Sequence, residues 1–219
     1  MTYILCIETT TTNCSVSISD EANVVALKEL NSANYSHSEK LHLFIKEVLQ
    51  TAKISLKDLS AVAVSKGPGS YTGLRIGVSA AKGLCFAQDL PLISIDTLQS
   101  LANQLNNQSD YIIPMIDARR MEVYTAVYDN KHNQLEETSA KILDENSFLN
   151  YLEKGKVMFL GNANEKFNSI CSHPNAVFID GKLPSAKEMC KLAIEKHKKS
   201  DFESVAYFEP YYLKDFIGG

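Results

Sequence analysis

The sequence lacks the segments that would place it in or across a membrane. No apolar run approaches the roughly 20 residues that a helix needs to cross a bilayer. The opening residues, MTYILCIETT, contain no basic segment of the kind that begins a signal peptide. Repeats, heptad arrays and low-complexity tracts are also missing. We therefore expect a soluble, cytoplasmic globular protein with no membrane partner.

A basic excess is missing as well. Lysine and arginine together number 22 against 26 aspartate and glutamate residues, which gives a net charge of −4. Proteins that bind nucleic acid alone usually carry a positive excess, so we do not expect this chain to hold RNA or DNA by itself. The cysteines are odd in number and none has CxxC spacing, which is typical of reduced, mostly buried thiols. They are Cys6, Cys14, Cys85, Cys171 and Cys190.

The usual catalytic signatures do not occur. There is no G-x-S-x-G segment, no set of histidines and cysteines at metal-binding spacing, and no cysteine with an evident basic neighbour. His37 and His42 are five residues apart, whereas the zinc-protease motif needs an i, i+4 pair. Although sites assembled from distant residues leave no local motif, these absences lower the expectation of catalysis.

The most informative stretch reads as a strand, a glycine loop and a helix. Ala61–Val64 is a short apolar run, Lys66–Tyr71 has turn composition, and the helix begins near Thr72 with Ser70 or Thr72 as its N-cap. This layout directs backbone N–H groups toward an anion. It is not a Walker A loop, because no lysine follows Gly73. A ligand contact and a purely structural turn both remain open.

Small residues recur along the helix after this loop. Gly73, Gly77 and Ala81 are four residues apart, with Ala80 and Gly83 nearby. A glycine inside a helix is roughly 1 kcal/mol less favourable than alanine, so several together indicate that something approaches closely. That object is either the chain's own sheet or a partner helix. On the second alternative, a leucine at Gly77 should abolish pairing and leave the fold intact.

A polar turn near the start of the chain is a second candidate for anion binding. Residues 8–13 (ETTTTN) carry one carboxylate followed by four threonines, which suits either phosphate binding or a solvated hairpin. Together with the glycine loop, this gives a candidate phosphate or nucleotide loop made of Glu8, Thr9, Thr10, Gly67, Gly69 and Ser70. A further charged turn, DARRME at residues 117–122, is either a turn with a salt bridge from Asp117 to Arg119 or Arg120, or a polar site.

Apolar periodicity predicts the remaining elements. The expected strands are Tyr3–Ile7, Cys14–Ser19, Asn23–Leu30, Leu92–Ile95, Tyr111–Ile116, Val123–Tyr128, Val157–Leu160 and Ala176–Ile179. The expected helices are Ser36–Ala52 with a capping box from Ser36 to Glu39, residues 96–103, Asp144–Leu152, and Pro184–Lys198 capped by Ser185.

The predicted strands and helices fall into two lobes. We place the boundary at the polar break that begins at residue 106, which gives lobes of residues 1–105 and 106–219. The aromatic tail Tyr207–Phe216 is expected to dock and to pack back on the first lobe.

Several blocks in this order resemble a known family. The first, ILCIETTTTNCSVSI, resembles the first hairpin of the actin, sugar-kinase and Hsp70 class of ATPase folds. The others are YSHSEKLHLFIKEVL, SKGPGSYTGLRIGVSAAKGLCF, PMIDARRMEVYTAVYD, FLGNAN and EPYYLKDF. With them, nearly the whole chain is similar to the TsaB (YeaZ) family, for which GPGSYTGLRIG is specific.

The resemblance implies an α/β fold of the actin/sugar-kinase/Hsp70-like type with a ribonuclease-H-like core and two lobes, the second reduced. It also implies descent from one ancestral fold with TsaD, the transferase that holds a metal through two histidines. The matching stretch here, Ser94–Ala102, contains no histidine, so the metal and the transfer chemistry are expected in TsaD.

The family further implies a non-catalytic activator of TsaD in forming the N6-threonylcarbamoyl group on adenosine next to the anticodon of tRNAs. The expected partners are TsaD and a second copy, each through a helical bundle, and the ATPase TsaE in the ternary complex. Contact with tRNA is expected only through the complex. The chain alone should bind no cofactor, while the complex uses ATP; family complexes can place a nucleotide near the TsaB–TsaD junction. The rival hypotheses are a glycoprotease-like enzyme and a nucleotide-binding domain that acts alone.

The helices that form the family's bundle give the predicted partner interface. It comprises Gly73, Leu74, Gly77, Val78, Ala80, Ala81, Leu84, His37, Leu41, Phe44 and Ile45. The apolar stripe of the helix at 36–52 is an alternative match to the chain's own sheet, since one stripe cannot serve both surfaces fully. Glu8 stands where the family often has aspartate, which leaves any phosphate or magnesium role there open.

Overall fold

The computed structural model describes residues 1–32, 37–106 and 109–214. The chain forms two compact units. Unit 1 comprises Met1–Thr97 and the segment that begins at Pro184, and unit 2 comprises Leu98–Leu183. No helix in the described part of the chain is long and apolar enough to cross a membrane.

Unit 1 is built on a five-stranded sheet in the order β3-β2-β1-β4-β5. Its strands are β1 (Tyr3–Glu8), β2 (Asn13–Asp20), β3 (Asn23–Asn31), β4 (Leu59–Gly67) and β5 (Leu92–Asp96). The first three strands form an antiparallel meander, and β4 and β5 run parallel to β1. The central strands β1 and β4 are apolar on both faces, as expected for strands that are covered on both sides.

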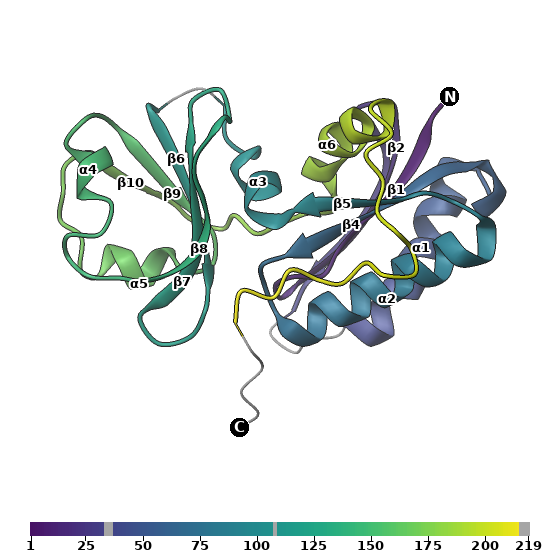
Figure 1. The fold of residues 1–219 in the computed structure, drawn as a ribbon, viewed down its shortest axis with the longest axis horizontal. Coiled ribbons are helices and arrows are strands. Elements are labelled where there is room, and N and C mark those ends of the chain that lie inside the picture. Colours follow the sequence, from purple (N-terminus) through teal and green to yellow (C-terminus); the bar gives the residue numbers. More distant parts are fainter. Residues whose placement is uncertain (33–36, 107–108, 215–219) are drawn as a thin grey trace. The chain divides into compact units, whose positions relative to one another are not determined.

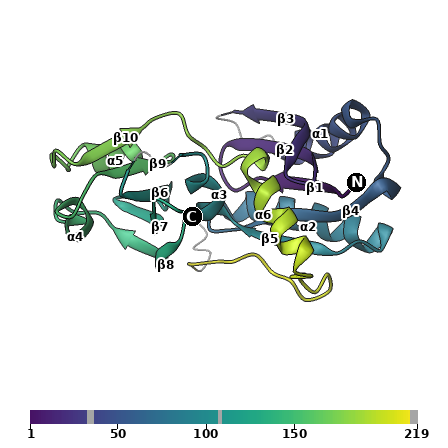
Figure 2. The same cartoon turned by 90° about the horizontal axis from the view of Figure 1, so that it is seen from above.

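Helices cover both faces of this sheet (Figures 1 and 2). They are α1 (His37–Ala52), α2 (Tyr71–Gln88) and α6 (Ala186–Lys198). Leu5 and Ile7 of β1 pack with α1 and α2, whereas Ile4 and Cys6 pack with α6. The alternation follows from the two-residue period of a strand. The helix α2 begins directly after the glycine loop that follows β4.

Unit 2 contains a second five-stranded sheet in the order β10-β9-β6-β7-β8. Its strands are β6 (Tyr111–Asp117), β7 (Glu122–Asp129), β8 (Gln134–Ile142), β9 (Val157–Leu160) and β10 (Ala176–Ile179). Its short helices are α3 (Thr97–Ala102), α4 (Leu149–Leu152) and α5 (Asn164–Asn168). Phe148, Phe159 and Phe167 form the centre of one apolar cluster, while Leu98 and Leu101 of α3 belong to the other.

The unit boundary differs from the sequence-based one. α3 falls in unit 2 because Leu98 and Leu101 pack in one cluster with Ile112 of β6. The segment after Pro184 returns to unit 1, since Met189 and Ala193 pack with its sheet. The second lobe is therefore shorter than residues 106–219.

Three elements differ from what the sequence predicted. β8 was not predicted, because this edge strand is largely polar and exposed and has no apolar period. The helix expected over Asp144–Leu152 is helical only at Leu149–Leu152, and Phe148 before it has a left-handed φ of 62°. The short helix α5 was missed. The capping box expected from Ser36 lies outside the described residues.

Candidate protein-interaction site

The helix α2 is defined by local contacts at both ends. Ser70 is its N-cap, and its hydroxyl accepts a hydrogen bond from the Gly73 amide at 3.3 Å. At the other end Asp89 takes a left-handed conformation with φ 52°, and its amide donates to the Cys85 carbonyl. These caps define where α2 begins and ends, and the packing of its sides decides which residues face outward.

The glycines of α2 lie against the first turn of the chain itself. A Cβ atom on Gly73 would be 2.0 Å from the Thr9 carbonyl oxygen, and one on Gly77 would be 2.3 Å from Thr9 Oγ1. Thr9 Oγ1 also donates a hydrogen bond to the Gly73 carbonyl at 2.7 Å. The close approach inferred from the sequence is therefore made by the chain's own first turn, between β1 and β2, and not by a partner helix. A leucine at Gly77 would disturb the fold, contrary to the sequence-based prediction.

Most other residues of the predicted partner interface are also buried in unit 1. They are Leu74, Val78, Ala81, His37, Leu41, Phe44 and Ile45. Leu41, Phe44, Ile45, Val78 and Ala81 pack with β1, β2 and β4, so the alternative that the apolar stripe of α1 faces its own sheet is the correct one. His37 Nε2–H donates to the Thr11 carbonyl at 2.7 Å, and burial lowers the pKa of the imidazole. A partner could not touch these side chains without opening the core.

A different face of α2 is open. Ala80 and Leu84, the remaining members of the predicted set, are half-buried and pack against the core of unit 1, as does Ile76. Nothing lies within 4 Å of a Cβ built on Gly83, and Phe86 is 85% exposed. We call these five residues the α2 outer face. Ile76, Ala80 and Gly83 follow the i, i+4, i+7 spacing of one helix side. This spacing could have been recognised in the sequence, although the row of Gly73, Gly77 and Ala81 is the stronger pattern.

The first turn uses its polar groups internally. The Glu8 carboxylate accepts hydrogen bonds from the Thr10 amide at 2.6 Å, from the Thr10 hydroxyl at 2.5 Å and from the Ser65 hydroxyl. Burial raises the pKa of Glu8, and these hydrogen bonds oppose that shift only in part. The Thr9 amide also donates to Glu8. The amides and hydroxyls of Thr9 and Thr10 are therefore already engaged within the chain.

The glycine loop closes on the same turn. The Ser70 amide donates to the Thr10 carbonyl at 2.7 Å, and a Cβ on Gly69 would be 2.5 Å from that oxygen. Gly67 has a φ of 113°, which side chains rarely adopt. These contacts favour the structural alternative for the loop, and a nucleotide at Glu8, Thr10 or the loop stays a prediction.

The C-terminal tail packs along α2, as predicted for a docked segment (Figure 1). Lys82 Nζ donates to the carbonyls of Ala206 and Phe208 at 3.1 and 2.9 Å. The Tyr211 amide donates to the Lys66 carbonyl at 2.7 Å. A groove between helix and tail is lined by Arg75, Val78, Ser79, Lys82, Phe208, Glu209, Pro210 and Tyr212. The tail therefore covers part of α2 and leaves Gly83 and Phe86 of the outer face exposed.

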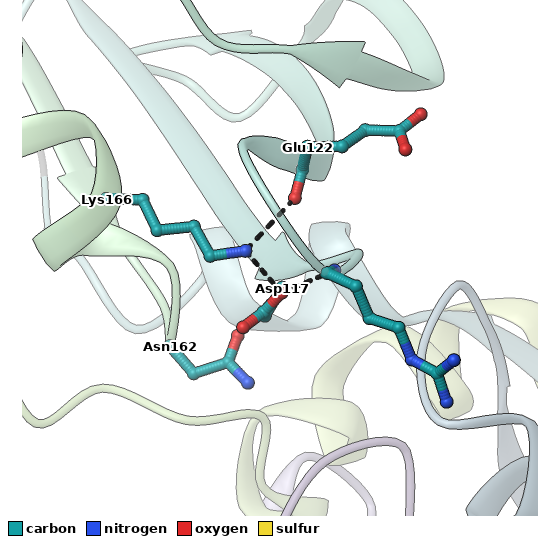
Figure 3. Close-up of polar contacts among 5 residues, drawn as sticks. Asp117, Glu122, Asn162 and Lys166 are labelled. Carbon is teal, nitrogen blue, oxygen red and sulfur yellow. Dashed lines mark hydrogen bonds and ion pairs between the residues drawn. The ribbon is translucent and has the colours of Figure 1, made fainter. Parts of the chain in front are cut away.

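Asp117 of the DARRME turn in unit 2 forms an ion pair, although with Lys166 of another element and not with Arg119 or Arg120 as expected (Figure 3). Lys166 Nζ of α5 lies 2.5 Å from Asp117 Oδ1. The Asp117 amide donates to Asn162 Oδ1 at 2.9 Å, and the Arg119 amide donates to Asp117 Oδ1 at 2.6 Å. The sequence could not identify Asn162 or Lys166, which are more than 40 residues away.

Cys14 and Cys85 are poor nucleophiles. Burial raises the pKa of Cys14 to about 11 and that of Cys85 to about 12, so these thiols are protonated at neutral pH and unreactive. Within residues 1–32, 37–106 and 109–214, no three His, Cys, Asp or Glu side chains are grouped so that they could hold a metal ion.

Comparisons with known proteins agree with this fold. A model of the family "TsaD: tRNA N6-adenosine threonylcarbamoyltransferase" matches residues 31–216. The chain is 32% identical to the tRNA threonylcarbamoyladenosine biosynthesis protein TsaB of Escherichia coli, over 98% of this chain and 95% of that protein. It is 35% identical to TsaB of Bacillus subtilis, over 72% of this chain and 70% of that protein.

A solved structure confirms the fold class. YeaZ from Pseudomonas aeruginosa superposes with a TM-score of 0.83 at 24% identity and covers 97% of this chain and 100% of its own. The expected α/β fold with two lobes is therefore correct. By sequence and by fold, this chain belongs to the TsaB (YeaZ) family.

Proposed function

We propose that this chain is a non-catalytic activator of TsaD in the formation of N6-threonylcarbamoyladenosine on tRNA. The names of its relatives place those proteins in tRNA threonylcarbamoyladenosine biosynthesis. The family model that matches the chain is described by the transferase itself, which supports common descent with TsaD. Two proteins of common descent can present similar helical surfaces, so a surface that pairs with a second copy can also pair with TsaD.

The observation that carries the proposal is the exposed Phe86 side chain beside the open position Gly83 on the α2 outer face. Burying a phenylalanine side chain contributes up to about 3 kcal/mol, yet Phe86 is left 85% exposed. Gly83 weakens the helix by about 1 kcal/mol relative to alanine, and no contact within 4 Å of its Cβ position explains it. A partner helix accounts for both, because glycine lets the two backbones approach and Phe86 supplies a contact.

The proposed partners and cofactors follow from an accessory role for this chain and a catalytic role for TsaD. TsaD carries out the transfer, and ATP is used by the complex while this chain holds no cofactor of its own. The complex includes TsaE and presents the tRNA. Buried thiols with raised pKa values and the absence of histidine from Ser94–Ala102 support an accessory role.

Substitutions on the outer face test the proposal. Phe86→Ala should weaken binding to TsaD from the same organism by about thirtyfold, since a central aromatic contact is worth about 2 kcal/mol. Gly83→Leu should abolish pairing and retain the fold, because the Cβ position meets open space. Isothermal titration calorimetry gives the affinities, and circular dichroism checks folding.

A matched control comes from unit 2. Leu135 on the edge strand β8 is a large apolar residue that is 48% exposed, so Leu135→Ala should leave binding unchanged. If Phe86→Ala and Gly83→Leu both bound TsaD with wild-type affinity, the outer face would not be the interface.

A further inference from the structure

Arginine is rare in this chain and is concentrated in one turn. Of the 22 basic residues only three are arginines, namely Arg75, Arg119 and Arg120. The last two are adjacent in the turn between β6 and β7, and both are exposed. The proposed pairing with TsaD uses α2 of unit 1, so it gives these residues of unit 2 no role.

The backbone of this turn is unfavourable for arginine. Arg119 and Arg120 have φ values of 72° and 49°, in the left-handed region where a Cβ atom crowds the following carbonyl. Glycine would adopt this conformation without that penalty. Residues held in such conformations are often found where a side chain serves a function.

Neighbouring groups hold the turn in place (Figure 3). Asp117 Oδ1 accepts hydrogen bonds from the Arg119 amide at 2.6 Å and from Lys166 Nζ at 2.5 Å. Lys166 Nζ also lies 3.5 Å from the Glu122 carbonyl, and Asn162 Oδ1 accepts the Asp117 amide at 2.9 Å. Lys166 therefore neutralises the carboxylate that is closest to the turn, and the Arg119 side chain takes no part in these bonds.

The two guanidinium groups are available to a ligand. Across the described residues, neither of them has a hydrogen-bond or ion-pair partner in the chain. A guanidinium is always charged and its planar set of donors matches the oxygens of a phosphate. The turn thus offers two adjacent anion-binding groups on a chain whose net charge is −4.

We propose that Arg119 and Arg120 bind phosphate groups of the tRNA backbone when the complex presents its substrate. The inference rests on the proposed function, which makes an RNA the substrate of the complex. The turn needs no groove for such a ligand, because every nucleotide carries an accessible phosphate. The negative net charge explains why the contact adds to binding by the complex and does not let this chain hold tRNA alone.

The magnitude of the effect follows from counterion release. Each phosphate contact adds about 0.7–0.9 to the slope of log affinity against log salt concentration. Two contacts therefore contribute a slope of about 1.5, equivalent to roughly an eightfold change in affinity between 50 and 200 mM salt.

The test measures binding of unmodified tRNA to the assembled complex of this chain and TsaD over that salt range. Replacing both residues, R119A with R120A, should lower the salt slope by about 1.5 and weaken binding about tenfold at the lowest salt. R119K with R120K should restore most of the slope, since lysine retains the charge. Lys154 and Lys156 are also exposed in unit 2, and K154A with K156A should keep the wild-type slope.

A glycine pair separates binding from folding. R119G with R120G should lose tRNA affinity as the alanine pair does, while its melting temperature is equal to or above that of the wild type because the backbone penalty is removed. An unchanged salt slope in the alanine pair would overturn the proposal. So would weaker association with TsaD in the absence of tRNA, which would assign the turn to an acidic protein surface. Failure of the wild-type chain to pair with TsaD would instead contradict the proposed function.

Discussion

Two glycines of one helix should respond to alanine in opposite directions. At Gly73 the new Cβ would lie 2.0 Å from the Thr9 carbonyl oxygen, so either α2 or the first turn must move. Overpacking of this kind costs roughly 1–3 kcal/mol, and because the obstacle is backbone we take the upper part of that range. The higher helix propensity of alanine offsets about 1 kcal/mol of this cost. We therefore expect Gly73→Ala to destabilise the protein by about 2 kcal/mol.

At Gly83 there is no obstacle within 4 Å, so Gly83→Ala should stabilise the protein by about 0.5–1 kcal/mol. Urea unfolding followed by far-UV circular dichroism gives both shifts on one scale. The midpoint should fall for Gly73→Ala and rise for Gly83→Ala. A midpoint for Gly73→Ala at or above that of the wild type would refute the assignment of this helix side to the first turn.

Three further predictions follow from single contacts. Burial gives Glu8 a higher pKa in the folded than in the unfolded chain. The unfolding free energy of the wild type, relative to that of Glu8→Gln, should therefore fall as the pH rises above the ordinary pKa of 4.5. Urea titrations that showed a pH-independent difference between the two proteins would contradict this. Lys82→Ala removes two hydrogen bonds to the tail, so chymotrypsin should cleave faster after the exposed Tyr207, with global stability changed by about 1 kcal/mol or less. Asp117→Ala breaks a partly exposed ion pair, so it should lower the free energy of unfolding by less than about 1 kcal/mol. It should also speed hydrogen exchange at the Arg119 amide, which donates to Asp117. Unchanged exchange at that amide would contradict the assigned hydrogen bond.

The sequence predicted the framework of the fold well because most of its elements have strong local signals. The apolar runs of β1 and β4 identified the central strands, and Ser70 and Ser185 proved to be the N-caps of α2 and α6. β8 had no such signal, since an exposed edge strand needs no apolar period. The unit boundary depends on which cluster α3 joins, and local composition does not determine that.

The interaction site was harder to predict than the fold. The spacing of Gly73 and Gly77 correctly indicated a close approach, but spacing cannot identify the approaching object. Both the chain's own turn and a partner helix require the same small side chains. Of the outer face, the sequence-based interface contained only Ala80 and Leu84. Phe86 was missed because its exposure depends on how α2 is rotated against the sheet.

Reconstitution tests the central claim most directly. Unmodified tRNA, threonine, bicarbonate and ATP are combined with the donor-forming enzyme, TsaD and TsaE of the same organism, and the modified nucleoside is measured with and without this chain. If the chain is the activator of TsaD, product forms only in its presence, and the chain without TsaD forms none. Equal product in its absence, or product from the chain without TsaD, would contradict the proposed function.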